Sequence, residues 1–213
     1  MNKKNCIIVI LYIILVYLVF FLDTNNENIN DENIIYIENF LDKTDYEKVL
    51  QLDKNKETFI YENFRYAKPL KENYIYNIFY DKYYIEKLQP YIKPKIYPSD
   101  FPIEHRFYPD DSNGMKWHKD TLLYDKPQYE AIFTITNKSQ STTQWKDKNG
   151  NLQELWTKPN SLLVVKAQGY EHHVTPPVIG EREILKLIYT QSNNVNQNYQ
   201  NEMKRFNNFN NNV

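Results

Sequence analysis

The second half of the chain, from Ile103 to Thr190, alternates apolar and polar residues in short runs that turn residues separate. Successive side chains on a strand point to opposite faces, so this alternation is typical of β-strands with one buried face. All four glycines of the chain fall in this half, at predicted turns, and Asn149-Gly150 predicts a two-residue hairpin turn. We therefore predict eight strands, at residues 103–108, 115–120, 129–136, 142–147, 152–157, 161–167, 171–175 and 182–190.

The first half of the chain has a different apolar period. Residues 34–37 and 58–66 predict short strands, whereas residues 44–47 have the form of a helix capping box. From Glu72 to Ile92 the apolar positions recur at helical spacing, which predicts a second helix. The fold class is therefore α+β and mainly β. Eight antiparallel strands with a ligand-holding interior predict a double-stranded β-helix, or jelly roll, with flanking N-terminal helices.

An unbroken apolar run from Cys6 to Leu22 predicts an N-terminal membrane anchor. As a helix it would be roughly 25 Å long, which is adequate for a thin bilayer. No small-residue cleavage site follows Phe20, so an uncleaved signal anchor is favoured over a cleaved signal peptide, which is the alternative. Lys3 and Lys4 precede the run and acidic residues follow it. This asymmetry predicts a single-pass protein with a cytosolic N-terminus and a lumenal or extracytoplasmic domain.

These patterns divide the chain into four parts. Residues 1–23 are the cytosolic stub and anchor, and residues 24–32 form a polar tether. Residues 33–191 form one globular domain. The Asn-rich segment 192–213 shows no apolar period, so we expect it to be disordered.

Composition excludes several classes of function. The net charge is −1, so no basic excess indicates nucleic-acid binding, and we expect none. The single cysteine, Cys6, lies in the apolar run, which rules out an intramolecular disulfide and a Cys-x-x-Cys metal site. Only four residues are arginine, at positions 65, 106, 182 and 205. A well-placed arginine is therefore informative.

The candidate chemistry lies in two short segments, Trp117–Asp120 and His172–Arg182. His118 and Asp120 are two positions apart, so on a strand both project from the same face and can bind one cation. An imidazole from the second segment would complete a facial triad of two histidines and one carboxylate, which suits non-haem Fe(II). His172 and the adjacent His173 are rival candidates. His105 is more typical of a histidine satisfied within a strand.

The spacing of these residues resembles the Fe(II)/2-oxoglutarate-dependent dioxygenase superfamily. Its motif is His-x-Asp, then about fifty residues, then a histidine followed by a basic residue about ten positions later. His172 lies 54 positions after His118 and ten before Arg182, so the resemblance favours His172 over His173. Residues 37–41 and the Arg106-Phe107-Tyr108 segment resemble the prolyl 4-hydroxylase-like branch.

The resemblance implies that His118, Asp120 and His172 bind Fe(II) and form the catalytic centre. It implies that Arg182 binds the far carboxylate of 2-oxoglutarate, with Tyr108 as a further contact, although Tyr108 fits a packed strand aromatic equally well. The cosubstrates would be 2-oxoglutarate and O2, with ascorbate as a possible addition. The expected reaction is hydroxylation of a prolyl or lysyl side chain of a protein or peptide.

Two other functions compete with this interpretation. AlkB-type oxidative demethylases have a similar tyrosine and His-x-Asp, but they place a second arginine where this chain has Ile188. A non-catalytic cupin-like module would bind metal or glycan without turnover, and the triad together with Arg182 argues against it. Strand alternation also turns Lys186 inward with Arg182, where it either reaches a second anion or lies at an opening.

Overall fold

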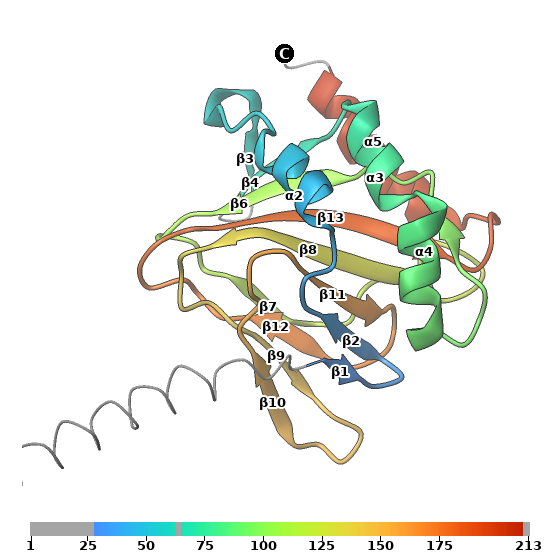
Figure 1. Cartoon of the computed structure of the whole chain (residues 1–213). Helices are drawn as coiled ribbons and strands as arrows, with labels where there is room; N and C mark the ends of the chain where they lie inside the picture. The colour runs from blue at the N-terminus through green and yellow to red at the C-terminus, as the bar shows by residue number, and fades with distance from the viewer. Residues whose placement is uncertain (1–27, 63–64, 211–213) are drawn as a thin grey trace, which may run out of the picture.

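The computed structural model describes residues 28–62 and 65–210, which form two antiparallel β-sheets and a group of helices (Figure 1). The larger sheet has the order β1-β2-β11-β8-β13-β6-β4-β3, with β5 paired to β13. The smaller sheet has the order β10-β9-β12-β7. The strands are β1 (Ile29–Asn30), β2 (Ile34–Ile37), β3 (Ile60–Glu62), β4 (Arg65–Pro69), β5 (Tyr97–Pro98), β6 (Glu104–Tyr108), β7 (Met115–His118), β8 (Tyr129–Asn137), β9 (Thr143–Lys146), β10 (Leu152–Leu155), β11 (Ser161–Lys166), β12 (His172–Val174) and β13 (Arg182–Thr190).

The larger sheet lies between the helices and the smaller sheet. Along β11, Leu162 and Val164 pack against the helices, whereas Leu163 and Val165 pack toward Trp145 of the smaller sheet. The helices on this face are α2 (Lys43–Leu50), α3 (Asn73–Phe79) and α4 (Lys82–Leu88) (Figure 1). Because both faces are covered, β11 is apolar at every position from Leu162 to Val165.

The predicted mainly-β architecture is confirmed, since each of the eight strands expected between residues 103 and 190 is present as β6 to β13. One connection differs. The turn expected at Asn149-Gly150 is a five-residue loop, Asp147–Asn151, because β9 and β10 pair from Lys146 and Leu152 outward. The Asp147 carboxylate accepts the backbone N–H groups of Asn149 and Asn151, which stabilises the longer loop.

The N-terminal half departs from the prediction in three places. Where one strand was expected over residues 58–66, two strands, β3 and β4, pair antiparallel. The helix expected over residues 72–92 is two helices and a 3-10 turn, because the Asp81 side chain accepts the N–H of Tyr83 and starts α4. Ile29 and Asn30 pair with β2, so the end of the predicted tether belongs to the larger sheet.

The prediction of a disordered C-terminal tail was wrong for residues 197–210. This segment forms helix α5 (Gln197–Asn210), and Tyr199, Met203 and Phe206 pack on a small apolar cluster. Their spacing of four and three residues is a helical stripe, which the surrounding asparagines conceal in a composition average. The cluster beneath comprises Phe101, Leu123, Tyr124 and Ile188.

The predicted membrane anchor lies outside the described residues. Within residues 28–62 and 65–210, no helix has the length and apolar character needed to cross a bilayer.

Candidate metal centre

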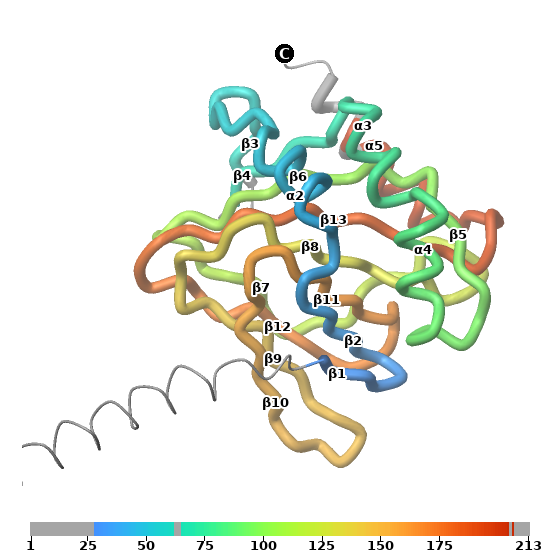
Figure 2. The backbone as a smooth tube through the Cα atoms, viewed as in Figure 1, coloured from blue at the N-terminus to red at the C-terminus, as the bar shows by residue number. Residues whose placement is uncertain are grey.

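Two strands far apart in sequence lie side by side in the smaller sheet (Figure 2) and bring the candidate ligands together. His118 ends β7 and pairs directly with His172, the first residue of β12. Asp120 follows two positions after His118, and its backbone carbonyl accepts hydrogen bonds from the backbone N–H and side-chain amide of Gln168. These contacts place Asp120 beside the histidine pair.

The three side chains converge on one point. His118 Nε2 lies 3.7 Å from Asp120 Oδ1, and His172 Nε2 lies 3.6 Å from Asp120 Oδ2. One ligand atom from each residue can be chosen so that all three lie within 4.8 Å of one another. A cation at about 2.1 Å from each ligand atom needs these atoms closer by about 1 Å.

The orientation of both imidazoles is fixed by backbone carbonyls. His118 Nδ1 lies 2.7 Å from the carbonyl oxygen of Lys116, and His172 Nδ1 lies 3.1 Å from that of Tyr170. A carbonyl only accepts, so Nδ1 is the donor in each ring, and the Nε2 lone pair is left for a metal. The donor set of two imidazoles and one carboxylate fits Fe(II).

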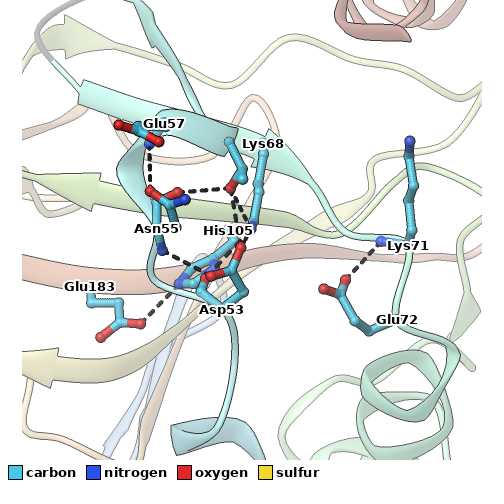
Figure 3. A network of polar contacts seen from close by, with 9 residues as sticks. Asp53, Asn55, Glu57, Lys68, Lys71, Glu72, His105 and Glu183 are labelled. Atoms are coloured by element: carbon cyan, nitrogen blue, oxygen red, sulfur yellow. Dashed lines mark hydrogen bonds and ion pairs between the residues drawn. The ribbon is translucent and has the colours of Figure 1, made fainter. Parts of the chain in front are cut away.

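The other two histidines of the described chain do not join this cluster. His173 faces the outside of the smaller sheet, where its Nε2 lies 2.7 Å from Gln144 Oε1 and its ring lies against Trp117 in a tilted contact. His105 is fully buried on the opposite side of the larger sheet, with its Nε2 2.9 Å from Glu183 Oε1 (Figure 3). Strand alternation separates each of them from the pocket.

The triad lines a cavity of about 60 Å³ between the two sheets. Arg182, Ile184 and Lys186 of β13 face this cavity, as their alternation predicts, and Tyr108 of β6 faces it beside Arg182. A glycine is required at the entry to β7. Gly114 has φ of +64°, and a Cβ there would lie 2.1 Å from the carbonyl oxygen of Val174.

Arg182 is a buried cation without a counter-ion. Its side chain has no ion pair among the described residues, and its Nε has no hydrogen-bond partner. Burial accordingly lowers the pKa of Arg182. The pKa of Tyr108 is also lowered, because the arginines at positions 65, 106 and 182 outweigh the effect of its burial, which raises it. This end of the cavity is therefore electropositive and fits a carboxylate.

One ion pair and one arginine with its counter-ion also border the cavity. Lys186 and Glu130 both line it, with Lys186 Nζ 2.6 Å from Glu130 Oε2. Arg106 lines it too and is held from behind by Glu104 through Nε and Nη2. Burial and the charge of Asp120 raise the pKa of Glu130 to about 7. The sequence interpretation missed Glu130, although a signal was present. It is an acidic residue at an inward position of an apolar strand.

The fold is thus a jelly roll of two facing antiparallel sheets, with two histidines and one carboxylate gathered between them. No model of a protein family matches the sequence, and no curated protein matches it either. Solved structures give a clear result.

An oxidoreductase of the 2OG-Fe(II) oxygenase family from Burkholderia pseudomallei is similar over 78% of this chain and 87% of its own, with a TM-score of 0.62 and 12% identity. A prolyl hydroxylase from Trichoplax adhaerens, solved with a hypoxia inducible factor peptide fragment, covers 76% and 85%, with a TM-score of 0.61 and 15% identity. A prolyl-4-hydroxylase from Pseudomonas putida covers 76% and 94%, with a TM-score of 0.56 and 13% identity. The resemblance stated from the sequence is therefore confirmed for the fold.

Proposed function

We propose that this protein is an Fe(II)- and 2-oxoglutarate-dependent dioxygenase that hydroxylates a C–H bond of a protein or peptide side chain. One observation carries the proposal: the triad and the unpaired Arg182 line the same cavity. A metal-only module would not need a buried guanidinium without a counter-ion, because such a group is costly unless an anion joins it.

Each pocket residue has a role that follows from its position. His118, Asp120 and His172 would hold Fe(II). Arg182 binds the far carboxylate of 2-oxoglutarate, and Tyr108 lies beside it as a second donor. When bound, the iron and the 2-oxo acid together activate O2 for attack on an unactivated C–H bond. Apolar side chains of both sheets, such as Leu163 and Val174, line the cavity and limit the access of water.

A peptide substrate is proposed by analogy with two of the structural neighbours, which are prolyl hydroxylases; one of them was solved with a peptide bound. A prolyl or lysyl side chain is the first candidate. The AlkB-type alternative receives no support. Ile188, where those enzymes have a second arginine, is fully buried in the apolar cluster under α5.

Turnover with labelled 2-oxoglutarate tests the proposal. The full chain with Fe(II) and ascorbate should release succinate, and candidate proline- or lysine-containing peptides should increase the yield. His118→Ala should abolish release together with iron content. His173→Gln is the matched control, since His173 is adjacent to a ligand but faces outward. If His118→Ala contained as much iron and released as much succinate as the unmodified protein, the proposal would be refuted.

We also propose that the protein is anchored in a membrane. The apolar run at residues 6–22 supports a single-pass anchor with the domain on the lumenal or extracytoplasmic side. A protease-protection assay on sealed membranes should leave the domain intact until detergent is added. Digestion of the domain from the cytosolic side would reverse the orientation.

A further inference from the structure

The metal-binding candidate Asp120 lies on irregular backbone. β7 ends at His118, which the pairing with β12 fixes, whereas residues 119–123 belong to no helix or strand. We call residues 119–125 the ligand loop. A metal ligand must be held to within about 0.5 Å of its productive place, so the backbone of this loop needs support from other parts of the chain.

Amide groups supply that support. The carbonyl oxygen of Asp120 accepts hydrogen bonds from Gln168, and the carbonyl oxygen of Thr121 lies 2.7 Å from Gln128 Nε2. The next three carbonyls of the ligand loop all accept hydrogen bonds from one residue near the C-terminus, Asn196. Five successive carbonyls are therefore held by donors from outside the loop.

Asn196 joins the ligand loop to the start of helix α5. Its side-chain Nδ2 lies 2.9 Å from the carbonyl oxygen of Leu122 and 3.3 Å from that of Tyr124, and its backbone N–H donates to that of Leu123. Its Oδ1 accepts the backbone N–H groups of the second and third residues of α5, at 2.9 and 3.2 Å. Asn196 is therefore the N-cap of α5 and, with the same carboxamide, a clamp on the loop.

The apolar face of α5 packs on the same loop. Leu123 and Tyr124 are buried in the cluster that α5 covers, and the ring centroids of Tyr124 and Tyr199 lie 5.6 Å apart. Before the helix begins, Asn194 accepts the backbone N–H of Asp125 and donates to its carboxylate through Nδ2. Because these contacts involve consecutive residues of the ligand loop, α5 docks in this way only on the loop conformation seen here.

We propose that Asn196 is a positioning residue of the metal centre, which couples the docking of α5 to the position of Asp120. This inference rests on the metal site of the proposed function. Metal binding needs Asp120 in place, and docking of α5 needs the ligand loop in place. Each event should therefore favour the other by the same factor. The asparagines of the C-terminal segment act here as amide donors to the metal centre.

Asn196→Ser separates the two roles of this side chain. A serine keeps an oxygen that caps α5 but lacks the amide that reaches the ligand loop. Calorimetric titration of the full-length protein should show an affinity for Mn(II) about tenfold lower than in the unmodified protein. The visible spectrum of the Co(II)-loaded variant should also change, because that spectrum reports the coordination geometry. The helix content measured by circular dichroism should stay the same.

Gln89→Ser is the matched control. Gln89 Nε2 also bridges two backbone carbonyls, at 2.7 Å from Ile92 and 2.9 Å from Pro94, and Ile92 lies in the cluster under the helices. Its loss should leave the Mn(II) affinity and the Co(II) spectrum unchanged. An unchanged Mn(II) affinity in Asn196→Ser would overturn the inference. Equal losses in the two variants would also overturn it, since a general loss of stability would explain both.

Limited proteolysis tests the coupling from the other end, and it needs no variant of Asn196. Saturating Mn(II) should slow tryptic cleavage after Lys204 in α5 several-fold in the unmodified protein, since cleavage follows the undocked fraction of the helix. Asp120→Asn should abolish this protection, and cleavage after Lys48 in α2 should not depend on the metal. Equal cleavage of α5 with and without bound Mn(II) would overturn the inference. If the unmodified protein bound no metal, the proposed function would fail, and this inference with it.

Discussion

The two faces of β13 carry buried charges of opposite kinds. On the helix-facing side, the Glu183 carboxylate accepts hydrogen bonds from Lys54, His105 and Thr136. On the cavity side, Arg182 is equally buried but has a nitrogen without a partner. One strand therefore holds a fully satisfied charge and an unsatisfied one, in adjacent residues.

The difference separates a buried charge that stabilises the fold from a buried charge that is available to bind a ligand. A buried ion whose hydrogen bonds are all made adds to specificity of folding and has nothing left for a ligand. A buried ion with a free donor costs stability until an anion arrives. If this distinction holds, variants on the two faces should change different quantities.

The largest effect should come from the ligand set. Asp120→Asn removes the only carboxylate of the triad and should lower the affinity for Fe(II) or Mn(II) by more than about 100-fold. Metal titration with calorimetry measures this. Asp111→Asn is the control, because it makes the same chemical change in an exposed loop near β7. Equal losses in the two variants would mean that Asp120 is not a ligand.

Arg182→Met should separate binding from stability. The dissociation constant for 2-oxoglutarate should rise about tenfold to 100-fold, because a charge-assisted pair is lost, while metal affinity stays the same. The melting temperature should stay the same or rise, since an unpaired buried cation is removed. A lower melting temperature with normal 2-oxoglutarate binding would make Arg182 a structural residue.

Glu183→Gln should give the opposite result. Loss of this carboxylate leaves Lys54 and His105 without their anion and should lower the free energy of unfolding by about 3 kcal/mol. Metal and 2-oxoglutarate affinities should not change. Urea unfolding and calorimetry would measure the two properties, and a changed affinity with normal stability would contradict the comparison.

The smallest effect should appear in the pH dependence of stability. Burial lowers the pKa of His105, although Glu183 opposes this, so below about pH 6.5 the unfolded chain binds a proton that the folded protein does not. Stability should therefore fall between pH 7 and 5. Burial would raise the pKa of Glu183, but His105 and Lys54 lower it, so its contribution is lost only at more acidic pH.

His105→Gln should reduce the fall in stability between pH 7 and 5, since the titrating group is gone. Urea unfolding at the two pH values measures the change. An equal pH dependence in the variant would show that another group is responsible.

Much of the fold could be predicted from the strands of the second half. Those covered on both faces are continuous apolar runs, and the others alternate strictly between apolar and polar residues. That His118, Asp120 and His172 meet could be predicted because the residues recur at short regular offsets, two positions from His118 to Asp120 and ten from His172 to Arg182. Helix α5 could not, because three apolar residues among asparagines give no compositional signal. The break between α3 and α4 depends on one cap, Asp81, which apolar periodicity does not detect.

The partners of the charged residues could not be predicted either. Lys186 was expected to face inward, but its anion, Glu130, lies on β8, more than fifty residues earlier. Such a contact depends on the register between strands, and the register is set by the assembled sheet.

The contact between Trp117 and His173 makes metal binding measurable by intrinsic fluorescence. Each is the immediate neighbour of a metal-binding candidate, and their rings lie against each other on the outer surface in a tilted contact, at 4.1 Å between centroids. A paramagnetic ion on the cavity-facing side of the same two strands would be separated from the Trp117 indole only by the strand backbone. Its arrival should quench the emission of Trp117, so occupancy could be followed by fluorescence without any label.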